Sequence, residues 1–325
     1  MSPTNTAGAL DAFRRRRERG VLRVTGRDRI EWLNGLLTND LKSREGPRAC
    51  PALWLTPQGR MITDVVVLEL GEETWLDVPA SLSAALAERF DRMIFAEDAR
   101  VTDASSELTS TGVYGSDAIE LLREAMGAGA AGDSLDPSAL AISHAPENES
   151  RVVYTHAIAS GLPGVHVYQT HANAQRFEDA RLTGRRRLDD HDATVLRVER
   201  GIPEFLVDTG EETIPLEAGL DDTISHTKGC YVGQEIIVRI RDRAHGRVAR
   251  KLVGLSFQDG AVPHVPQGVT SDGRQAGRVT SAVMSAAVGH SIALATLLRD
   301  FTEPGTSVVL EDGTPAVVTA LPFVD

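Results

Sequence analysis

The residues best suited to chemistry lie around Cys230, in the segment KGCYVGQE that spans residues 228–235. Gly229 and Gly233 would let the backbone turn tightly or approach a ligand closely. If the segment leads into a helix, Cys230 lies at or before its first turn, where free N–H groups and the helix dipole stabilise a thiolate. Lys228 adds a nearby positive charge, and both effects lower a thiol pKa. The pattern predicts a reactive cysteine, with a small buried apolar side chain as the alternative.

A second candidate is Glu199, in the helical pattern HDATVLRVERG. Leu196 and Glu199 are three residues apart and share a helix face, so an inward Leu196 would draw Glu199 toward the interior. A carboxylate in that position needs a hydrogen-bonding partner. Spacing alone favours the other interpretation, an exposed glutamate paired with Arg197 or Arg200.

Two runs of basic residues interrupt a chain whose net charge is −12. The first covers Arg14–Arg17 and continues through Glu18 to Arg19, and charge runs of this kind predict a solvated helix face. The second run holds Asp242 and these bases: Arg239, Arg241, Arg243, Arg247, Arg250 and Lys251. This run could bind the carboxylates of a ligand, or its arginines could bind RNA phosphates. The third interpretation is an ordinary solvated surface.

The composition limits the classes of protein that need to be considered. With 325 residues and a hydrophobic share of 42%, the chain can bury a core and is long enough for two or three structural units. Its acidity opposes non-specific binding to nucleic acid. Two cysteines provide neither a disulfide framework nor a four-thiolate metal site. Since we also find no signal peptide and no run of about 18 apolar residues, we expect a cytoplasmic protein without a membrane span or a bound metal.

The order of predicted elements indicates an α+β body followed by a β domain. Strands are predicted at residues 20–26, 61–70, 151–158 and 164–170, and helices at 29–41, 81–94, 116–127, 172–182 and 190–200. Asp28 is the expected cap of the first helix. Residues 128–150 are small, polar and proline-containing, which predicts a surface excursion or linker. From residue 250 onward, short apolar segments predict a small barrel or sandwich, so we divide the chain into residues 1–245 and 246–325.

The octapeptide KGCYVGQE resembles the signature of the YgfZ family of folate-binding, iron–sulfur-cluster-associated proteins, relatives of the glycine-cleavage T-protein aminomethyltransferase. The resemblance extends over nearly the whole chain. It includes LNGLLTNDL and ALWLTPQGRMITDVVV near the N-terminus, LRVERGIPEF and IPLEAGLD upstream of the octapeptide, and GRVTSAVMS, GHSIALA and LPF near the C-terminus. It implies two related folate-binding α+β subdomains around a central hole, with a C-terminal antiparallel β-barrel.

The resemblance also implies a ligand and the residues that bind it. The ligand is tetrahydrofolate or a folate derivative, and the acidic residue of LRVERG, here Glu199, would hold the pterin by accepting from its exocyclic amine and ring N–H together. Cys230 and Lys228 are then the expected functional pair. The other residues expected at the folate site are Arg197, Asp64, Tyr231, Gly233, Gln234 and Arg239, with the second basic run holding the glutamyl tail of the folate.

Two departures separate this chain from the T-protein. Where the T-protein has two adjacent aspartates in the strand that faces the folate, this chain has Thr63 and Asp64, and where it usually has an acid this chain has Cys230. By resemblance, both indicate a tetrahydrofolate-binding accessory protein that uses Cys230 in the assembly, maintenance or repair of iron–sulfur proteins, including tRNA-modifying enzymes. One thiolate cannot hold a cluster alone, so iron–sulfur proteins or their assembly machinery are the expected partners, without direct nucleic-acid binding.

Two alternatives stay open. One is folate-dependent aminomethyl or one-carbon transfer, as in the T-protein, in which case Asp64 would act on the folate N5 position. The other is a scaffold that binds a protein partner and needs neither folate nor the thiol. The second cysteine, Cys50 in RACPALWL, is expected to be an ordinary buried thiol.

Overall fold

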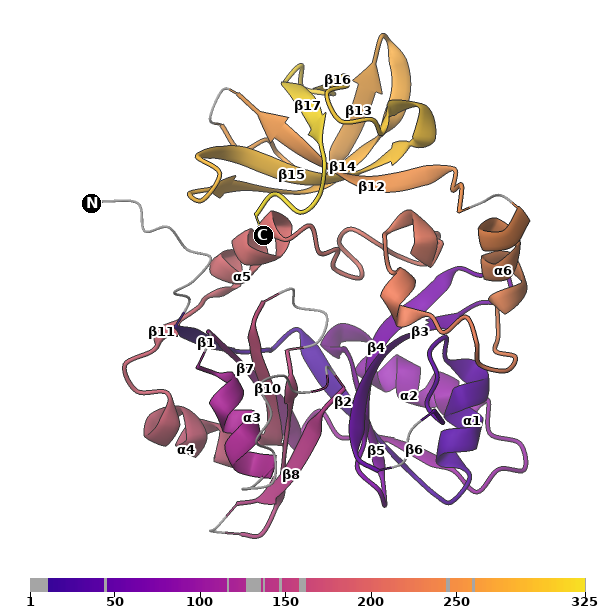
Figure 1. Ribbon diagram of the computed structural model, residues 1–325, viewed down its shortest axis with the longest axis vertical. Coiled ribbons are helices and arrows are strands. Elements are labelled where there is room, and N and C mark those ends of the chain that lie inside the picture. Colours follow the sequence, from indigo (N-terminus) through magenta and orange to yellow (C-terminus); the bar gives the residue numbers. More distant parts are fainter. Residues whose placement is uncertain are drawn as a thin grey trace.

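The first two strands of the chain belong to different sheets, and this separation organises the body. The computed structural model describes residues 11–43, 46–115, 117–126, 136, 138–145, 148–157, 162–243, 246–258 and 261–324. β1 (Ala12–Arg15) joins a six-stranded sheet, whereas β2 (Arg19–Thr25) joins a five-stranded sheet. The turn between them therefore runs from one sheet to the other (Figure 1).

The five-stranded antiparallel sheet, in the order β3-β4-β5-β2-β6, is the centre of the first subdomain. Its other strands are β3 (Arg48–Leu55), β4 (Met61–Glu69), β5 (Thr74–Pro79) and β6 (Arg100–Asp103). The helices are α1 (Arg29–Leu36) and α2 (Ser83–Asp91), with the short turn η1 (Ala80–Leu82) before α2. Asp28 precedes α1 as expected, but its side chain does not cap the helix. Its Oδ2 instead accepts from the N–H of Asp98 at 2.8 Å.

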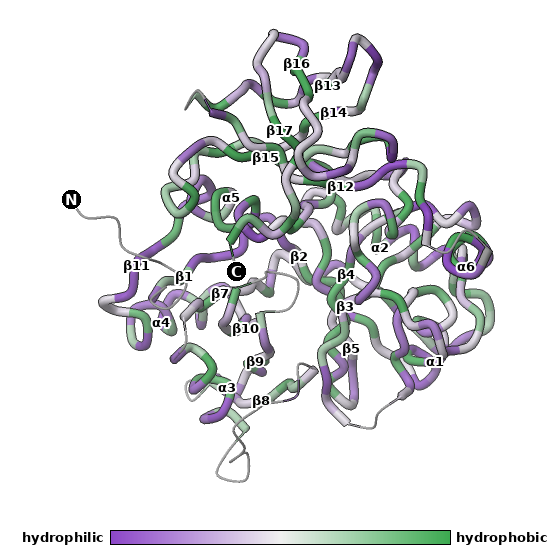
Figure 2. Tube along the Cα trace, turned by 45° about the horizontal axis from the view of Figure 1, so that its top comes forward, coloured by the Kyte–Doolittle hydropathy of each residue, from purple (hydrophilic) through white to green (hydrophobic). Residues whose placement is uncertain are grey.

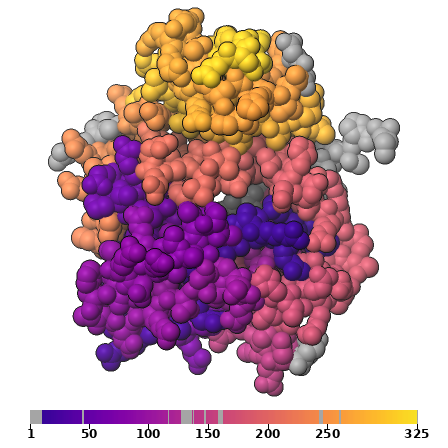
Figure 3. All heavy atoms as spheres, turned by 180° about the vertical axis from the view of Figure 1, so that it is seen from behind, coloured from indigo at the N-terminus to yellow at the C-terminus, as the bar shows by residue number. Residues whose placement is uncertain are grey.

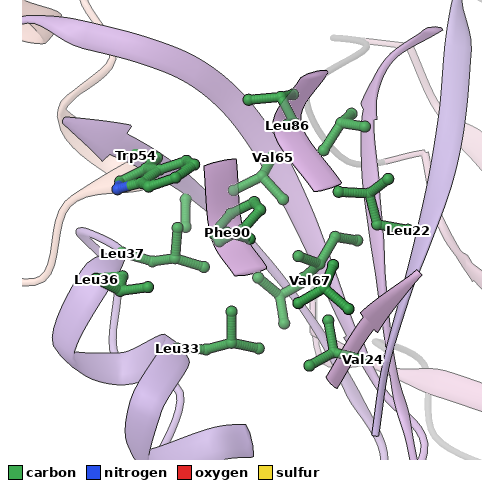
Figure 4. Packing of buried hydrophobic residues seen from close by; sticks show 14 of the residues in the cluster. Leu22, Val24, Leu33, Leu36, Leu37, Trp54, Val65, Val67, Leu86 and Phe90 are labelled. Carbon is green, nitrogen blue, oxygen red and sulfur yellow. The ribbon is translucent and has the colours of Figure 1, made fainter. Parts of the chain in front are cut away.

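Side chains between this sheet and its two helices form a closely packed core (Figure 4). The ring of Trp54 stacks on that of Phe90 with centroids 4.0 Å apart, and Leu33, Val65 and Leu86 belong to the same cluster. Truncating a buried aromatic ring in such a core costs about 3–5 kcal/mol. The core therefore fixes β4, the strand that carries Asp64, on a rigid support.

The six-stranded sheet has the order β11-β1-β7-β10-β9-β8 and forms the second subdomain. Its remaining strands are β7 (Leu108–Tyr114), β8 (Leu140–His144), β9 (Arg151–His156), β10 (Gly164–Thr170) and β11 (Arg186–Arg187). α3 (Ile119–Met126) and α4 (His171–Arg181) pack against it. Another apolar cluster, which includes Trp75 and Tyr168, joins the two sheets, so the two subdomains share one interior.

The last strands close into a six-stranded antiparallel barrel in the order β12-β15-β14-β13-β16-β17. They are β12 (Arg250–Phe257), β13 (Gln267–Ser271), β14 (Arg274–Ser285), β15 (His290–Leu298), β16 (Ser307–Leu310) and β17 (Pro315–Thr319), with the turn η4 (Arg299–Phe301) after β15. Closure of the barrel removes free strand edges.

The segment between body and barrel contains two helices. These are α5 (Asp190–Glu199) and α6 (Gln234–Arg243), with the short turns η2 (Pro215–Glu217) and η3 (Asp221–Thr223) between them. α5 lies beneath the barrel, where Val198 packs against Leu252 and Val283, whereas α6 lies at the edge of the first subdomain (Figure 1). The capping box of Asp189 and Asp192 explains why α5 begins at Asp190.

The α+β body and the C-terminal antiparallel barrel are confirmed, and the predicted helices have counterparts in α1 to α5. The interpretation of the first basic run as a solvated helix face is wrong. Arg14–Arg19 spans the end of β1, a turn and the start of β2, and Arg16 is buried. This burial is possible because carboxylates from distant elements neutralise the run.

The predicted linker at residues 128–150 is wrong in part, because β8 lies within it, while residues 127–135, 137 and 146–147 lie outside the described residues. The division into residues 1–245 and 246–325 stays a prediction. α6 ends at Arg243 and β12 begins at Arg250, so the predicted boundary lies between these two elements. Within the described ranges, no helix is long and apolar enough to cross a membrane.

Candidate functional site

A cavity of about 530 Å³ lies where the β1–β2 turn, the two sheets and α5 meet. Figure 3 shows the side of the molecule on which the indigo atoms of β1 and β2 border a hollow beneath the segment that precedes the barrel. The turn and the sheets contribute polar groups to the wall, namely Arg14, Arg16, Arg17, Glu18, Arg19, Asp64, Tyr114 and His166. α5 and the loop after it contribute Asp190, Thr194, Leu196, Arg197, Glu204 and Phe205. The cavity wall thus carries charged groups on both sides, with apolar residues between them in the lining, among them Val66, Leu162 and Leu196.

A fully buried carboxylate, Asp77 on β5, anchors the charged groups of the turn. Its Oδ2 accepts from Arg16 Nη1 at 2.6 Å and from the Tyr168 hydroxyl at 2.6 Å, and its Oδ1 accepts from Arg19 Nε. Burial opposes ionisation of Asp77, but the charges of Arg16 and Arg19 outweigh it and hold the pKa of this carboxyl well below its usual 3.8. Asp77 is therefore a permanent negative charge that neutralises part of the first basic run.

Arg19 links this anchor to Asp64 on β4. Arg19 Nη1 donates to Asp64 Oδ2 at 2.8 Å, while its Nη2 donates to the main-chain oxygen of Asp77 at 2.9 Å. The side chain of Asp64 is 34% exposed, yet its Oδ1 is buried and has no hydrogen-bond partner within the described structure. A buried carboxylate oxygen without a donor is unfavourable, and such atoms mark places where a ligand or water can bind.

His166 on β10 is a second unsatisfied group in the cavity wall. It is 1% exposed, and neither ring nitrogen has a hydrogen-bond partner among the described residues. The rings of Tyr114 and Tyr168 contact the imidazole edge-on. Burial, and then the charge of Arg16, lower the pKa of His166 well below 6.5, so the ring is neutral near pH 7. A neutral imidazole offers one donor and one acceptor to a ligand.

Arg197 belongs both to the cavity wall and to the contact with the barrel. Its Nη1 donates to Asp208, and its Nη2 donates to the Ser281 hydroxyl on β14 at 2.8 Å. Asp208 in turn accepts from Thr280 and Ser281 at 2.6 and 2.7 Å. Arg197 Nε lies 3.2 Å from Glu204 Oε2, and burial raises the pKa of Glu204 despite this cation. The network fixes α5 on the barrel and leaves Glu204 at the cavity.

Glu199 is buried, as one interpretation of the sequence expected, but it faces the barrel. Its Oε1 accepts from the Ser285 hydroxyl on β14 at 2.5 Å, and its main-chain oxygen accepts from the N–H groups of Phe323 and Val324. Leu196 and Arg197 line the cavity, and Glu199 is absent from the described lining. Its role in holding a pterin stays a prediction.

Cys230 is exposed and precedes α6, which begins at Gln234. The ammonium group of the neighbouring Lys228 donates to three main-chain oxygens at the end of α1 and just after it, those of Asn34, Leu37 and Asn39, at 2.6, 2.8 and 2.8 Å. Burial lowers the pKa of Lys228 to about 8. Lys228 therefore fastens the Cys230 segment to α1, and its proposed catalytic role stays a prediction.

The other predicted residues of this segment pack it against the first subdomain. The ring of Tyr231 is buried in a cluster with Phe205, and burial raises the pKa of Tyr231 to about 12. Gly233 has φ +86°, and a Cβ there would lie 2.5 Å from the main-chain oxygen of Thr56. Gln234 Oε1 accepts from the N–H of Tyr231 at 3.2 Å. None of these three residues is part of the described cavity lining, so their roles in folate binding stay predictions.

Two further residues complete the comparison with the sequence. Arg239 is exposed on α6 and lies outside the described lining, so its contact with folate also stays a prediction. Cys50 is half-buried, and burial raises its pKa to about 11, as expected of an unreactive thiol. Among the described residues, no group of three or more His, Cys, Asp or Glu side chains is arranged to hold a metal ion.

Sequence reasoning identified two residues of the cavity, Asp64 and Arg197, and missed His166, Arg19 and the buried Asp77. The alternation in GVHVYQT puts His166 and Tyr168 on one strand face, which was the available signal for His166. No local pattern could have paired Asp77 with Arg16, because 61 positions separate them in the chain.

Comparison with known proteins identifies two domains of one family. Residues 17–228 match the GCVT N-terminal domain, and residues 250–325 match the glycine cleavage T-protein C-terminal barrel domain. The probable aminomethyltransferase of Natronomonas pharaonis is 30% identical over 94% of this chain and 85% of that protein. The aminomethyltransferase of Saccharopolyspora erythraea is 28% identical over 94% of this chain and 84% of that protein, and the enzyme of Bacillus subtilis is 24% identical over 90% and 81%.

A solved structure supports the same architecture. The glycine cleavage system aminomethyltransferase T from Bartonella henselae matches with a TM-score of 0.82 at 18% sequence identity, over 98% of this chain and 87% of that chain. At this identity the likeness shows the fold, with N-terminal subdomains and a closed barrel. The domain matches cover most of the chain, and it therefore belongs to the glycine cleavage T-protein family.

Proposed function

We propose that the chain binds tetrahydrofolate, or a close folate derivative, in the central cavity. The volume of about 530 Å³ lies within the roughly 300–1,000 Å³ of typical small-molecule sites. Asp64 Oδ1 and the two ring nitrogens of His166 are buried polar atoms that require partners. A pterin offers several N–H donors beside ring acceptors, so the ligand used by the family is chemically suited to these atoms.

Asp64 carries the proposal. Asp64 lines the cavity, Arg19 holds its Oδ2, and its Oδ1 is buried without a partner; a ligand that reached Oδ1 would give it an N–H to accept, or Oδ1 would hold a proton. Bound tetrahydrofolate would supply the nucleophilic nitrogen that takes up a one-carbon unit. Asp64 would orient this nitrogen and accept at Oδ1 the proton that the transfer releases.

His166 and the apolar wall would orient the ligand. The neutral imidazole, on the other sheet from Asp64, can donate through one nitrogen and accept through the other. Val66, Leu162 and Leu196 supply apolar surface for the faces of a ring. An arrangement with polar groups at two points and apolar contacts between them would select a flat ring with polar edges.

One-carbon transfer is the use of folate that the relatives support best. The three relatives named above are called aminomethyltransferases, and they match this chain over nearly its whole length. We therefore place a folate-dependent aminomethyl or related one-carbon transfer ahead of the iron–sulfur hypothesis. Asp64, the one aspartate of the expected pair that this chain has, lines the cavity, and this supports ranking one-carbon transfer first.

The exposed thiol of Cys230 supports a second candidate function, that of a YgfZ-like accessory protein for iron–sulfur proteins. Lys228 and Gly233 anchor the turn that carries this thiol, so it is displayed in a defined position. Thr63, which replaces one of the two expected aspartates, is fully buried, and its hydroxyl donates to the main-chain oxygen of Asp64 at 2.9 Å. It supplies no second carboxylate, which weakens the likeness to a transferase.

Calorimetric titration of tetrahydrofolate into the anaerobic protein tests the binding site. We expect Asp64→Asn and His166→Leu to weaken binding roughly tenfold or more, because each leaves polar atoms of the ligand unpaired. Asp242→Asn, on the exposed α6, is the matched control and should bind as the natural protein does. If both cavity variants fold and bind tetrahydrofolate with natural affinity, the proposed site is contradicted. Glu199→Gln tests in the same way whether Glu199, as the sequence predicted, holds the pterin.

Two assays separate the candidate functions. If the protein is a transferase, it forms methylene-tetrahydrofolate from an aminomethyl donor with release of ammonia, and Asp64→Asn reduces the rate by about 100-fold or more while Cys230→Ala leaves it unchanged. If it is an accessory protein, Cys230→Ala fails to restore the activity of iron–sulfur enzymes in cells that lack the gene. Full restoration by Cys230→Ala would remove the second candidate.

A further inference from the structure

We infer that Asp77 is a positioning residue, which acts through Arg19 to fix Asp64 at the cavity. The inference rests on the proposed function, in which Asp64 is the group that meets the ligand. Asp77 itself is fully buried, so it acts only through its neighbours.

The contacts of Asp77 come from three separate elements. Arg16 belongs to the β1–β2 turn, Arg19 to the start of β2, and Tyr168 to β10 in the other sheet. Arg16 Nη1 also lies within hydrogen-bond distance of the Ser110 and Tyr168 hydroxyls, at 3.2 and 3.3 Å. One carboxylate thus holds the turn against both sheets, next to Arg16 and Arg19 of the cavity wall.

The geometry of Arg19 explains why this carboxylate matters for Asp64. Arg19 uses Nε on Asp77 Oδ1 and Nη2 on the main-chain oxygen of Asp77, which fixes the plane of the guanidinium. Its Nη1 is then directed at Asp64 Oδ2, at 2.8 Å. This contact holds Oδ2 of Asp64, while its Oδ1 stays unpaired.

Stability alone does not account for such a network. Buried ion pairs are often no more stabilising than apolar side chains of similar volume, because removing the charges from water is costly. A buried network beneath a cavity that fixes a carboxylate with a free oxygen fits a support for the site, since functional groups need neighbours that lock their orientation.

Charge balance gives the inference a second consequence. Arg16 and Arg19 face two carboxylates, Asp77 and Asp64. Replacement of Asp77 by a neutral residue leaves Asp64 as the one of these two carboxylates opposite both guanidinium groups, so the position of Arg19, and with it that of Asp64, is no longer fixed. The other charged or titratable groups of the cavity wall, unchanged by this replacement, are Arg14, Arg17, Glu18, Tyr114, His166, Asp190, Arg197 and Glu204.

Glu69 provides a matched control in the same subdomain. It is a buried carboxylate on β4 that pairs with Arg29 at 2.7 Å and accepts from the Thr74 hydroxyl. It lies outside the described cavity lining. Glu69→Gln should therefore destabilise the fold in the same manner as Asp77→Asn without altering Asp64.

The experiment compares natural protein, Asp77→Asn and Glu69→Gln at a temperature at which all three are folded. The carboxyl-carbon resonance of Asp64 is recorded by NMR at pH 7 without ligand, and tetrahydrofolate affinity is measured by calorimetry. In Asp77→Asn we expect the Asp64 resonance to move or broaden and the affinity to fall roughly tenfold, because the carboxylate is no longer held in place. Glu69→Gln should change neither quantity.

An unchanged Asp64 resonance together with natural affinity in Asp77→Asn would overturn the inference. If the natural protein itself does not bind tetrahydrofolate, the proposed function fails, and the ligand-free resonance of Asp64 still decides whether Asp77 acts on Asp64. Should Asp77→Asn not fold, Arg19→Lys replaces it, because lysine keeps the charge but cannot span both carboxylates. Its Asp64 carboxyl resonance should also move, and no movement would overturn the inference.

Discussion

The two basic runs of the chain look alike in sequence and have opposite environments in the fold. Both are hydrophilic in Figure 2, one at β1 and the other around α6. In the first run Arg16 is buried against Asp77, whereas in the second Arg239 is exposed and Arg241 pairs with its neighbour Asp242 at 2.7 Å. The run predicted to be solvated forms part of a cavity wall, whereas the run predicted to hold a ligand is spread over the surface, from α6 to the start of β12.

The difference lies in where the opposite charges come from. Arg15 and Arg16 find Glu178 and Asp77, which follow them by 163 and 61 positions. Arg241 finds an acid at the next position. A charge run can therefore be buried when folding brings distant carboxylates to it, and the local pattern of charges says nothing about that.

The largest expected effect tests this contrast directly. Asp77→Ala removes the carboxylate that pairs with buried Arg16 and leaves Arg19 with Asp64 alone, so the free energy of unfolding should fall by about 3–5 kcal/mol. Asp242→Ala, which removes the exposed partner of Arg241, should leave the free energy of unfolding nearly unchanged. Urea unfolding at pH 7 measures both, and equal losses would end the distinction between the two runs.

A second prediction concerns the turn that leads into α6. Gly233→Ala should cost about 1–3 kcal/mol, because φ is +86° and the added Cβ would meet the main-chain oxygen of Thr56 at 2.5 Å. Gly229 has nothing within 4 Å of an added Cβ, so Gly229→Ala is the control with little expected effect. If the two variants unfold at the same urea concentration, the turn is not anchored as described.

Lowering the pH should reduce the stability of the protein, beginning with the effect of His166 in the cavity wall. The pKa of His166 is below its value of about 6.5 in the unfolded chain, so unfolding takes up a proton and stability falls as pH drops below 6.5. The slope from one such group is at most about 1.4 kcal/mol per pH unit. Asp77 contributes a further loss of stability only below about pH 4, because its pKa in the folded protein is depressed. Urea midpoints at pH 7 and pH 5 should differ less in His166→Leu than in the natural protein.

The smallest expected effect separates the two runs as ligand-binding surfaces. Arg17 is exposed and belongs to the cavity wall, so Arg17→Ala should weaken tetrahydrofolate binding about two- to fivefold, in line with the modest strength of exposed ion pairs. Arg239→Ala should leave the affinity unchanged. A loss confined to Arg239→Ala would return the ligand to α6, where the sequence interpretation had it.

The sequence by itself determined the order of the elements, the α+β body and the C-terminal barrel. Hydrophobic periodicity is a local property, and it was enough to identify β4 with Asp64 and α5 with Arg197. The octapeptide around Cys230 marked this segment as a functional candidate. The packing roles of Gly233 and Lys228 became visible only in their contacts with Thr56 and α1.

Only the tertiary structure decided which charges are buried and which polar atoms lack partners. Asp77 meets Arg16 and Tyr168 because two sheets face each other, and His166 loses solvent because its strand forms the wall of the cavity between them. Glu199 and Leu196 share α5, yet one faces the barrel and the other the cavity. These outcomes depend on contacts between residues far apart in the chain, which periodicity and spacing do not encode.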